Sequence, residues 1–132
     1  MSVQKLQELV DQYPYVDARA KKLECNYFGD EITLVYESTD EKDVCCQFIG
    51  CFNVIFDHDK IFDKLRPVKD MNYVHMPYFM FNITVGEVLG ENRHFYTCKI
   101  DMGLLQIEIC CEKIIVTRID ALITDGKKSS EF

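Results

Sequence analysis

No apolar run in this sequence reaches the roughly 18 residues that a membrane-spanning helix needs. The first twenty residues also lack a basic segment followed by an apolar stretch, which is the pattern of a secretion signal. We therefore expect a protein that stays in the cytoplasm and does not bind membranes.

The common motifs of catalysis and nucleotide binding are missing too. The six glycines form neither a G-x-G-x-x-G fingerprint nor a P-loop. None of the serines lies in a nucleophile elbow, because they fall near the N-terminus, in a polar loop or in the tail: Ser2, Ser38, Ser129 and Ser130. The sequence predicts a non-enzymatic protein without a cofactor.

The seven cysteines show no C-x2-C spacing, which a structural zinc site would favour. Their number is odd, and two pairs are adjacent, at Cys45-Cys46 and at Cys110-Cys111. On one extended strand, Cys46 would face the core while Cys45 and Cys51 point to the other side. We expect reduced, mostly buried thiols, with a metal site using Cys110 or Cys111, or redox chemistry, as alternatives.

The charge balance is acidic, with 22 Asp and Glu against 15 Lys and Arg and a formal charge of −7. Such a surface repels nucleic acid and anionic lipid but attracts a basic protein. Apolar residues make up 48% of the chain, enough to fill one core. We predict a single domain over residues 1–124, followed by a disordered polar tail over 125–132.

One amphipathic helix is predicted over residues 2–12, where Val3, Leu6, Leu9 and Val10 form a stripe. Most of the remaining chain alternates between apolar and polar residues, as strands do. Two hairpins are expected, one over residues 19–37 and one over 79–100, and the second places Phe79, Phe81, Ile83 and Val85 on one face. A last strand over 105–112 either continues through 114–116 or is followed by a separate one.

Between the hairpins, residues 44–57 predict a long strand with a bulge or bend at Gly50. Its core face would carry Val44, Cys46, Phe48, Phe52, Val54 and Phe56. Residues 58–77 predict an irregular connection with a helical turn. The fold class is therefore mainly β (α+β), an antiparallel six- to seven-stranded sandwich or partly open barrel with a short N-terminal helix.

Acidic residues gather at two places that we interpret as loops: Asp40, Glu41 and Asp43, and then Asp57, Asp59 and Asp63. We predict that they bind a basic partner, whose association they would accelerate by electrostatic steering. The alternative is that they form solvated faces. His58 between Asp57 and Asp59 would suit a metal ion or acid–base chemistry, but a solvated strand end explains it as well.

Aromatic and methionine side chains crowd the stretch from Met71 to Phe81. We interpret them as core residues. The alternative is a pocket near Tyr73 to Phe81, joined by His58 or a carboxylate, in a small-ligand-binding or minor enzymatic domain.

Three segments carry a resemblance to a known class: Val16-Asp17-Ala18 before a hairpin, the run from Cys46 to Val54, and Ile107-Glu108-Ile109-Cys110. In size, charge and strand rhythm the chain resembles, over residues 15–120, small bacterial immunity proteins of polymorphic or contact-dependent toxin systems. The resemblance implies a cytoplasmic antitoxin that covers the active site of a cognate toxin, often a basic nuclease domain. It implies no catalytic residues.

Overall fold

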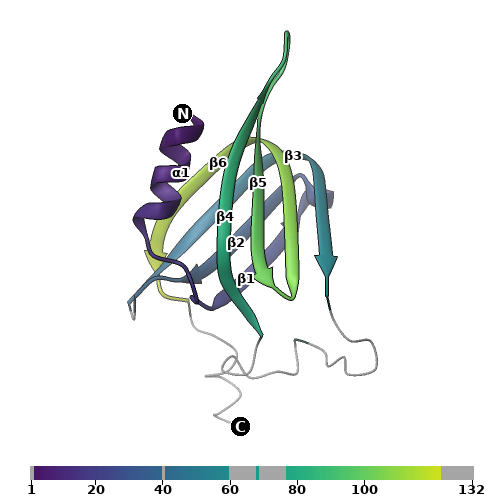
Figure 1. Ribbon diagram of the computed structural model, residues 1–132. Helices are drawn as coiled ribbons and strands as arrows, with labels where there is room; N and C mark the ends of the chain where they lie inside the picture. The colour runs from purple at the N-terminus through teal and green to yellow at the C-terminus, as the bar shows by residue number, and fades with distance from the viewer. Residues whose placement is uncertain (1, 40, 60–67, 69–76, 123–132) are drawn as a thin grey trace.

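The computed structural model describes residues 2–39, 41–59, 68 and 77–122. Its strands form one antiparallel sheet in the order β1-β2-β3-β6-β5-β4 (Figure 1). The elements are α1 (Val3–Gln12), β1 (Ala20–Asn26), the 3-10 turn η1 (Tyr27–Gly29), β2 (Glu31–Glu37), β3 (Lys42–His58), β4 (Tyr78–Leu89), β5 (His94–Gly103) and β6 (Leu105–Asp120). The predicted connection over 58–77 and the tail over 125–132 lie almost wholly outside the described residues.

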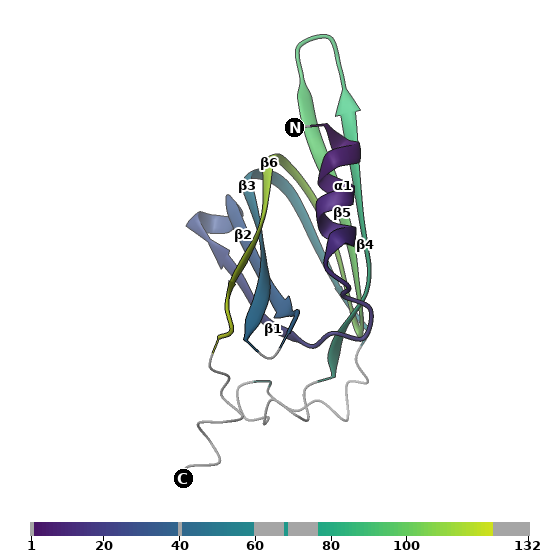
Figure 2. The same cartoon turned by 90° about the vertical axis from the view of Figure 1, so that its left-hand side faces the viewer.

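Helix α1 forms where the sequence predicts it. The Ser2 hydroxyl caps its first turn by accepting a hydrogen bond from the Lys5 amide at 3.3 Å. Leu6 and Val10 are buried against the sheet. The helix lies beside β4, over the side of the sheet that holds the core (Figure 2).

Strands β3 and β6 are long and pair with each other over almost their whole length. The first half of β3 also pairs with β2, whereas the first half of β6 pairs with β5. The sheet therefore consists of two halves joined by these strands, and it curves around the core without closing. The mainly β class with one N-terminal helix is confirmed, and the open curved sheet corresponds to the partly open barrel among the expected alternatives.

The bend predicted at Gly50 is present. Gly50 has φ +69°, and a Cβ added there would lie 3.0 Å from the Glu112 carboxylate, so both backbone and space favour glycine. The register of β3 against β6 shifts between Cys51 and Asn53. The alternation of inward and outward side chains along β3 consequently changes here, so that Cys51 is buried and Phe52 is 51% exposed. The prediction that Phe52 faces the core and Cys51 faces away is wrong, because the bulge reverses the alternation.

A similar shift affects the start of β4. Its register against β5 is irregular between Tyr78 and Asn82. Met80 is fully buried while Phe81 is largely exposed, although Ile83 further along is buried as expected. The predicted common face of Phe81 and Ile83 is therefore wrong.

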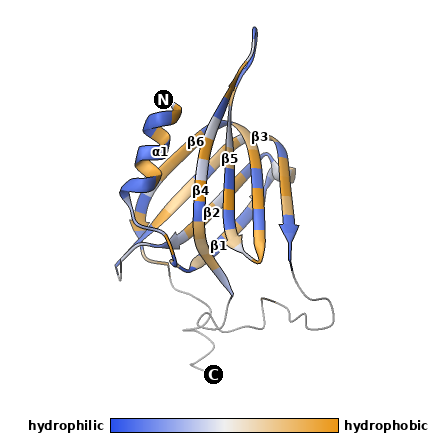
Figure 3. Ribbon diagram, viewed as in Figure 1, coloured by the Kyte–Doolittle hydropathy of each residue, from blue (hydrophilic) through white to orange (hydrophobic). Residues whose placement is uncertain are grey.

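Most of the buried apolar side chains form one core cluster to which all six strands and α1 contribute. Along the strands, hydrophobic and hydrophilic residues alternate (Figure 3). Most thiols are buried, as expected: Cys46, Cys51, Cys98 and Cys111 belong to this core, and Cys45 is buried outside it. No helix within the described ranges is long and apolar enough to cross a membrane.

The outer edge of β4 is covered by groups from the N-terminal segment. The Gln7 carboxamide donates to the Ile83 carbonyl at 3.0 Å and accepts from the Val85 amide at 2.7 Å, as a neighbouring strand would. The Tyr15 hydroxyl accepts from the Ile83 amide at 3.2 Å. Two backbone hydrogen bonds, each of 2.8 Å, link Met80 to the segment at Asp17 and Ala18. From Met80 to Val85 this edge is thereby closed to further strand pairing.

Candidate protein-binding surface

Polar side chains cover the convex side of the second half of the sheet, where β3, β6, β5 and β4 lie side by side. Two cross-strand rows follow from the register: Ile55, Glu108, Lys99 and Thr84, and beside them Asp57, Gln106, Asp101 and Asn82. Together they line a shallow hollow of about 440 Å³. Since the opposite sides of β5 and β6 are buried here, this surface is the one that these strands present to other molecules.

Carboxylates dominate the charge of this surface. Asp57, Asp101 and Glu108 lie in the two rows, and Glu112 follows two positions after Cys110 on the same side of β6. The ammonium of Lys99 lies 3.5 Å from the Glu108 carboxylate, and both side chains are largely exposed. We call Asp57, Asp101, Glu108 and Glu112 the acidic face. Lys99 lies among the first three of these carboxylates and Arg93 lines a neighbouring hollow with Glu112, so four carboxylates against two cations leave the face with a negative charge.

Asp101 is held in a fixed orientation. Its Oδ1 accepts hydrogen bonds from the Gly103 amide at 2.9 Å and from the Gln106 carboxamide at 2.7 Å. No described residue donates a hydrogen bond to its Oδ2, which leaves this oxygen available to a ligand. A carboxylate that is already oriented loses less conformational entropy when it pairs with a cation.

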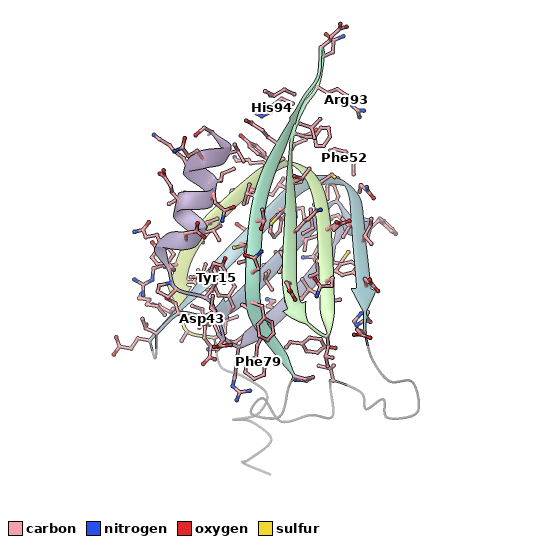
Figure 4. The ribbon with its side chains drawn as sticks, viewed as in Figure 1. Tyr15, Asp43, Phe52, Phe79, Arg93 and His94 are labelled. Carbon is pink, nitrogen blue, oxygen red and sulfur yellow. The ribbon has the colours of Figure 1, made fainter. Side chains whose placement is uncertain are left out.

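An aromatic cluster borders the acidic face at the bend of β3 (Figure 4). The rings of Phe52 and Phe95 meet edge to face with centroids 4.8 Å apart, and the Arg93 guanidinium lies 5.8 Å from the Phe52 centroid. His94 pairs with Glu87 at 2.9 Å in the adjoining hairpin arm. The cluster gives the polar surface an apolar border that a partner can bury.

The predicted acidic residues do not form one patch. Glu41 is exposed just before β3 begins, whereas Asp57 and Asp59 are exposed where that strand ends. The strand runs up one side of the sheet and down the other, so these groups lie at opposite ends of an arch (Figure 1). Asp40 and Asp63 lie outside the described residues.

Asp43 is not on the surface at all. Its side chain has no exposed area, and its Oδ1 lies 3.1 Å from the Lys21 ammonium on β1. Its Oδ2 accepts a hydrogen bond from the Leu122 amide at 2.8 Å, and Lys21 donates to the Leu122 carbonyl at 3.2 Å. The expectation that Asp43 extends a solvated acidic loop is wrong, because its charge is used inside the protein to hold three segments together.

Asp101, Glu108 and Glu112 are absent from the predicted partner-binding residues. The alternation along residues 105–112 places Glu108 and Glu112 opposite the apolar face, so their exposure was visible in the sequence. What the sequence did not show is the register, which brings Glu108 beside Ile55 and Lys99.

His58 does not converge with its neighbouring carboxylates. Asp57 lines the hollow of the acidic face, whereas His58 lines a different hollow of about 240 Å³ with Tyr78 and Lys21. The described residues around that second hollow include no carboxylate. Within the described parts of the chain, no three His, Cys, Asp or Glu residues are grouped so as to hold a metal ion. Met71, Tyr73 and Met76, which the pocket alternative invokes, lie outside the described residues.

The buried thiols are poor nucleophiles. Burial raises the pKa of Cys46 and of Cys111 to about 12, and that of Cys51 to about 11. A thiol reacts as the thiolate, which is scarce at neutral pH when the pKa is this high. These cysteines therefore serve as small apolar core residues.

The fold and the surface together define a small antiparallel-sheet protein with a filled core and a negatively charged convex face. A protein-family model described as "Immunity protein PIM7" matches residues 2–118. The chain belongs to the PIM7 immunity protein family, an assignment in keeping with the predicted immunity-protein class and with a non-enzymatic protein.

Two further comparisons add little to this. No curated protein matches the chain. Among solved structures it is similar to the crystal structure of an uncharacterized protein from Neisseria gonorrhoeae, with 17% sequence identity, a TM-score of 0.49, and coverage of 78% of this chain and 92% of that one.

Proposed function

We propose that this protein neutralises a cognate toxin by binding a basic surface of it with the acidic face and so covering the toxin's active site. Membership of an immunity protein family supports the existence of a toxin partner. The observation that supports this choice of surface is the set of three carboxylates, Asp57, Asp101 and Glu108, around a shallow hollow in which Lys99 is the one lysine. A nuclease domain fits such a partner, because proteins that bind nucleic acid present basic patches.

The mechanism requires no chemistry by the immunity protein. Negative charge attracts the basic toxin over a distance comparable to the Debye length, about 8 Å at physiological salt. Burial of Phe52 and Ile55, which are 51% and 47% exposed, then contributes the apolar part of the contact. The bound protein excludes the toxin's substrate by its volume.

The test uses the toxin domain encoded beside the immunity gene. Its association and dissociation rates would be measured by surface plasmon resonance at several salt concentrations. We expect the variant Asp57→Asn/Glu108→Gln to associate about tenfold more slowly at low salt, because rim charges act mainly on the association rate. The difference from wild type should shrink as salt rises.

A matched control removes two carboxylates elsewhere. Glu8 on α1 and Glu24 on β1 are both outside the acidic face, so Glu8→Gln/Glu24→Gln changes the net charge equally. An equal loss of association rate in this control would show that only net charge matters and would reject the acidic face as the binding surface. The variant Glu41→Gln examines the other end of β3 in the same way.

The proposal includes a cytoplasmic location, since a toxin must be met where its target lies. Cell fractionation with an antibody against the native protein tests this. Recovery of the protein from the envelope fraction would count against it.

A further inference from the structure

The second half of β3 is an edge of the sheet. The pairing of β2 with β3 ends at Ile49, so the segment from Asn53 to His58 pairs with β6 alone. In Figure 1 this part of β3 descends at the border of the sheet, away from β1 and β2. No hydrogen bond from another described residue reaches its open side.

The direction of its backbone groups follows from one hydrogen bond. The Asp59 amide donates to the Leu104 carbonyl at 2.8 Å, so Asp59 faces β6. Antiparallel pairing makes successive residues alternate in direction. The amides and carbonyls of His58, Phe56 and Val54 therefore point to the open side, as an added strand would require.

The other edges of the sheet are protected. Gln7, Tyr15 and the segment at Asp17 and Ala18 occupy the outward backbone groups of β4 at Met80, Ile83 and Val85. Strand β1 carries the exposed Lys22–Glu24 ion pair. Charged side chains are a common defence of an edge.

No other described residue hydrogen-bonds to the open side of β3, and exposed apolar side chains lie on both faces of this edge. Phe52 and Ile55 are exposed on the convex side, and Phe56 is 40% exposed beside the concave side. An unpaired apolar edge is an association hazard unless a partner uses it.

We propose that the cognate toxin contributes one β-strand that pairs with the open edge of β3 at Val54, Phe56 and His58. This inference rests on the proposed function and adds the binding mode to it. Asp57 and Asp59 flank the edge, so the incoming strand is expected to carry Lys or Arg there. A second copy of this chain fits less well, because it would bring another formal charge of −7 to the same place.

A proline at position 56 tests the edge directly. Phe56→Pro removes an amide that points away from β6 and blocks strand addition, yet an edge strand tolerates proline at such a position. Phe56→Ala is the matched control, since it removes the same ring but keeps the amide. We expect Phe56→Pro to bind the toxin domain at least about tenfold more weakly than Phe56→Ala, through lost backbone hydrogen bonds, with similar melting temperatures.

Amide hydrogen exchange of the wild-type protein gives a second readout that does not depend on a variant folding. The amides of Val54, Phe56 and His58 should exchange quickly in the free protein and become protected in the toxin complex. A complex that forms with these amides still exposed, or equal affinity of the proline and alanine variants, overturns strand addition while the proposed function stands. A toxin domain that does not bind at all overturns both. Wild-type dimers that Phe56→Pro converts to monomers would assign the edge to a second copy and overturn the toxin strand.

Discussion

Removing the buried carboxylate of Asp43 should destabilise the fold strongly. This side chain is fully buried, pairs with the Lys21 ammonium at 3.1 Å and accepts the Leu122 amide at 2.8 Å. Asp43→Ala removes the carboxylate that both the nearly buried Lys21 ammonium and the Leu122 amide contact. Breaking a buried ion pair from one side costs about 3–5 kcal/mol. Lys21 keeps its contact with the Leu122 carbonyl and 9% exposure, so we expect the lower end, about 3 kcal/mol.

Urea denaturation measures this cost. With a slope of about 1.5 kcal/mol per molar, the unfolding midpoint of Asp43→Ala should fall by about 2 M. Asp43→Asn retains an oxygen for the Leu122 amide and should lose about half as much. Asp120→Asn is the control, because it breaks the exposed Lys42–Asp120 pair and should leave the midpoint unchanged.

The double variant Lys21→Met/Asp43→Leu separates the pair from its surroundings. Replacing both charges by apolar groups of similar volume often restores stability, so its midpoint should lie near the wild-type value. The reasoning is refuted when Asp43→Ala shifts the midpoint by less than about 0.5 M, or when the double variant is as unstable as Asp43→Ala.

Three other predictions concern the bend, the thiols and the β4 edge. Gly50→Ala should cost about 1–3 kcal/mol, because φ is +69° and the new Cβ meets Glu112, and urea denaturation checks it. Burial raises the pKa of Cys46 to about 12 from an ordinary value of 9.0, so the folded state disfavours its thiolate. The free energy of unfolding should therefore be unaffected by this thiol below pH 9 and decrease as the pH rises toward 12. In unfolding experiments in reducing buffer, the stability of Cys46→Ala should decrease less over this pH range. Gln7→Ala should lower the free energy of unfolding by about 1–2 kcal/mol and promote self-association, since it uncovers the Ile83 carbonyl and the Val85 amide. Light scattering tests the self-association with Glu8→Ala as the control, and equal scattering by the two variants would contradict it.

Local patterns predicted the elements well because each depends on near neighbours in sequence. The stripe of Leu6 and Val10 identified α1, and the alternation around Val44, Cys46 and Phe48 identified the first half of β3. These apolar residues share one side of their helix or strand, and that side faces the core wherever the element lies in the fold. Gly50 likewise predicted the bend correctly, because a glycine within a strand indicates a bend whatever the partner strand is.

Predictions failed where a distant segment decided the outcome. Phe52 faces outward because the register of β3 against β6 shifts beside it. The alternation of apolar and polar residues within β3 alone does not reveal that shift. Asp43 looked like one more loop carboxylate, yet Lys21 arrives from 22 positions earlier and Leu122 from 79 positions later. Asp57 was among the predicted binding residues, but its grouping with Glu108 and Asp101 was missed for the same reason, since the three belong to different strands.

The position of β6 has a consequence for folding. It is the last described strand along the chain, yet it lies at the centre of the sheet between β3 and β5. The two halves can be joined only once this strand has been synthesised, so contacts between residues such as Cys46 and Val116 must close long loops. Such distant pairings slow folding. Each newly made molecule can therefore complete its core only after the chain has been synthesised as far as β6.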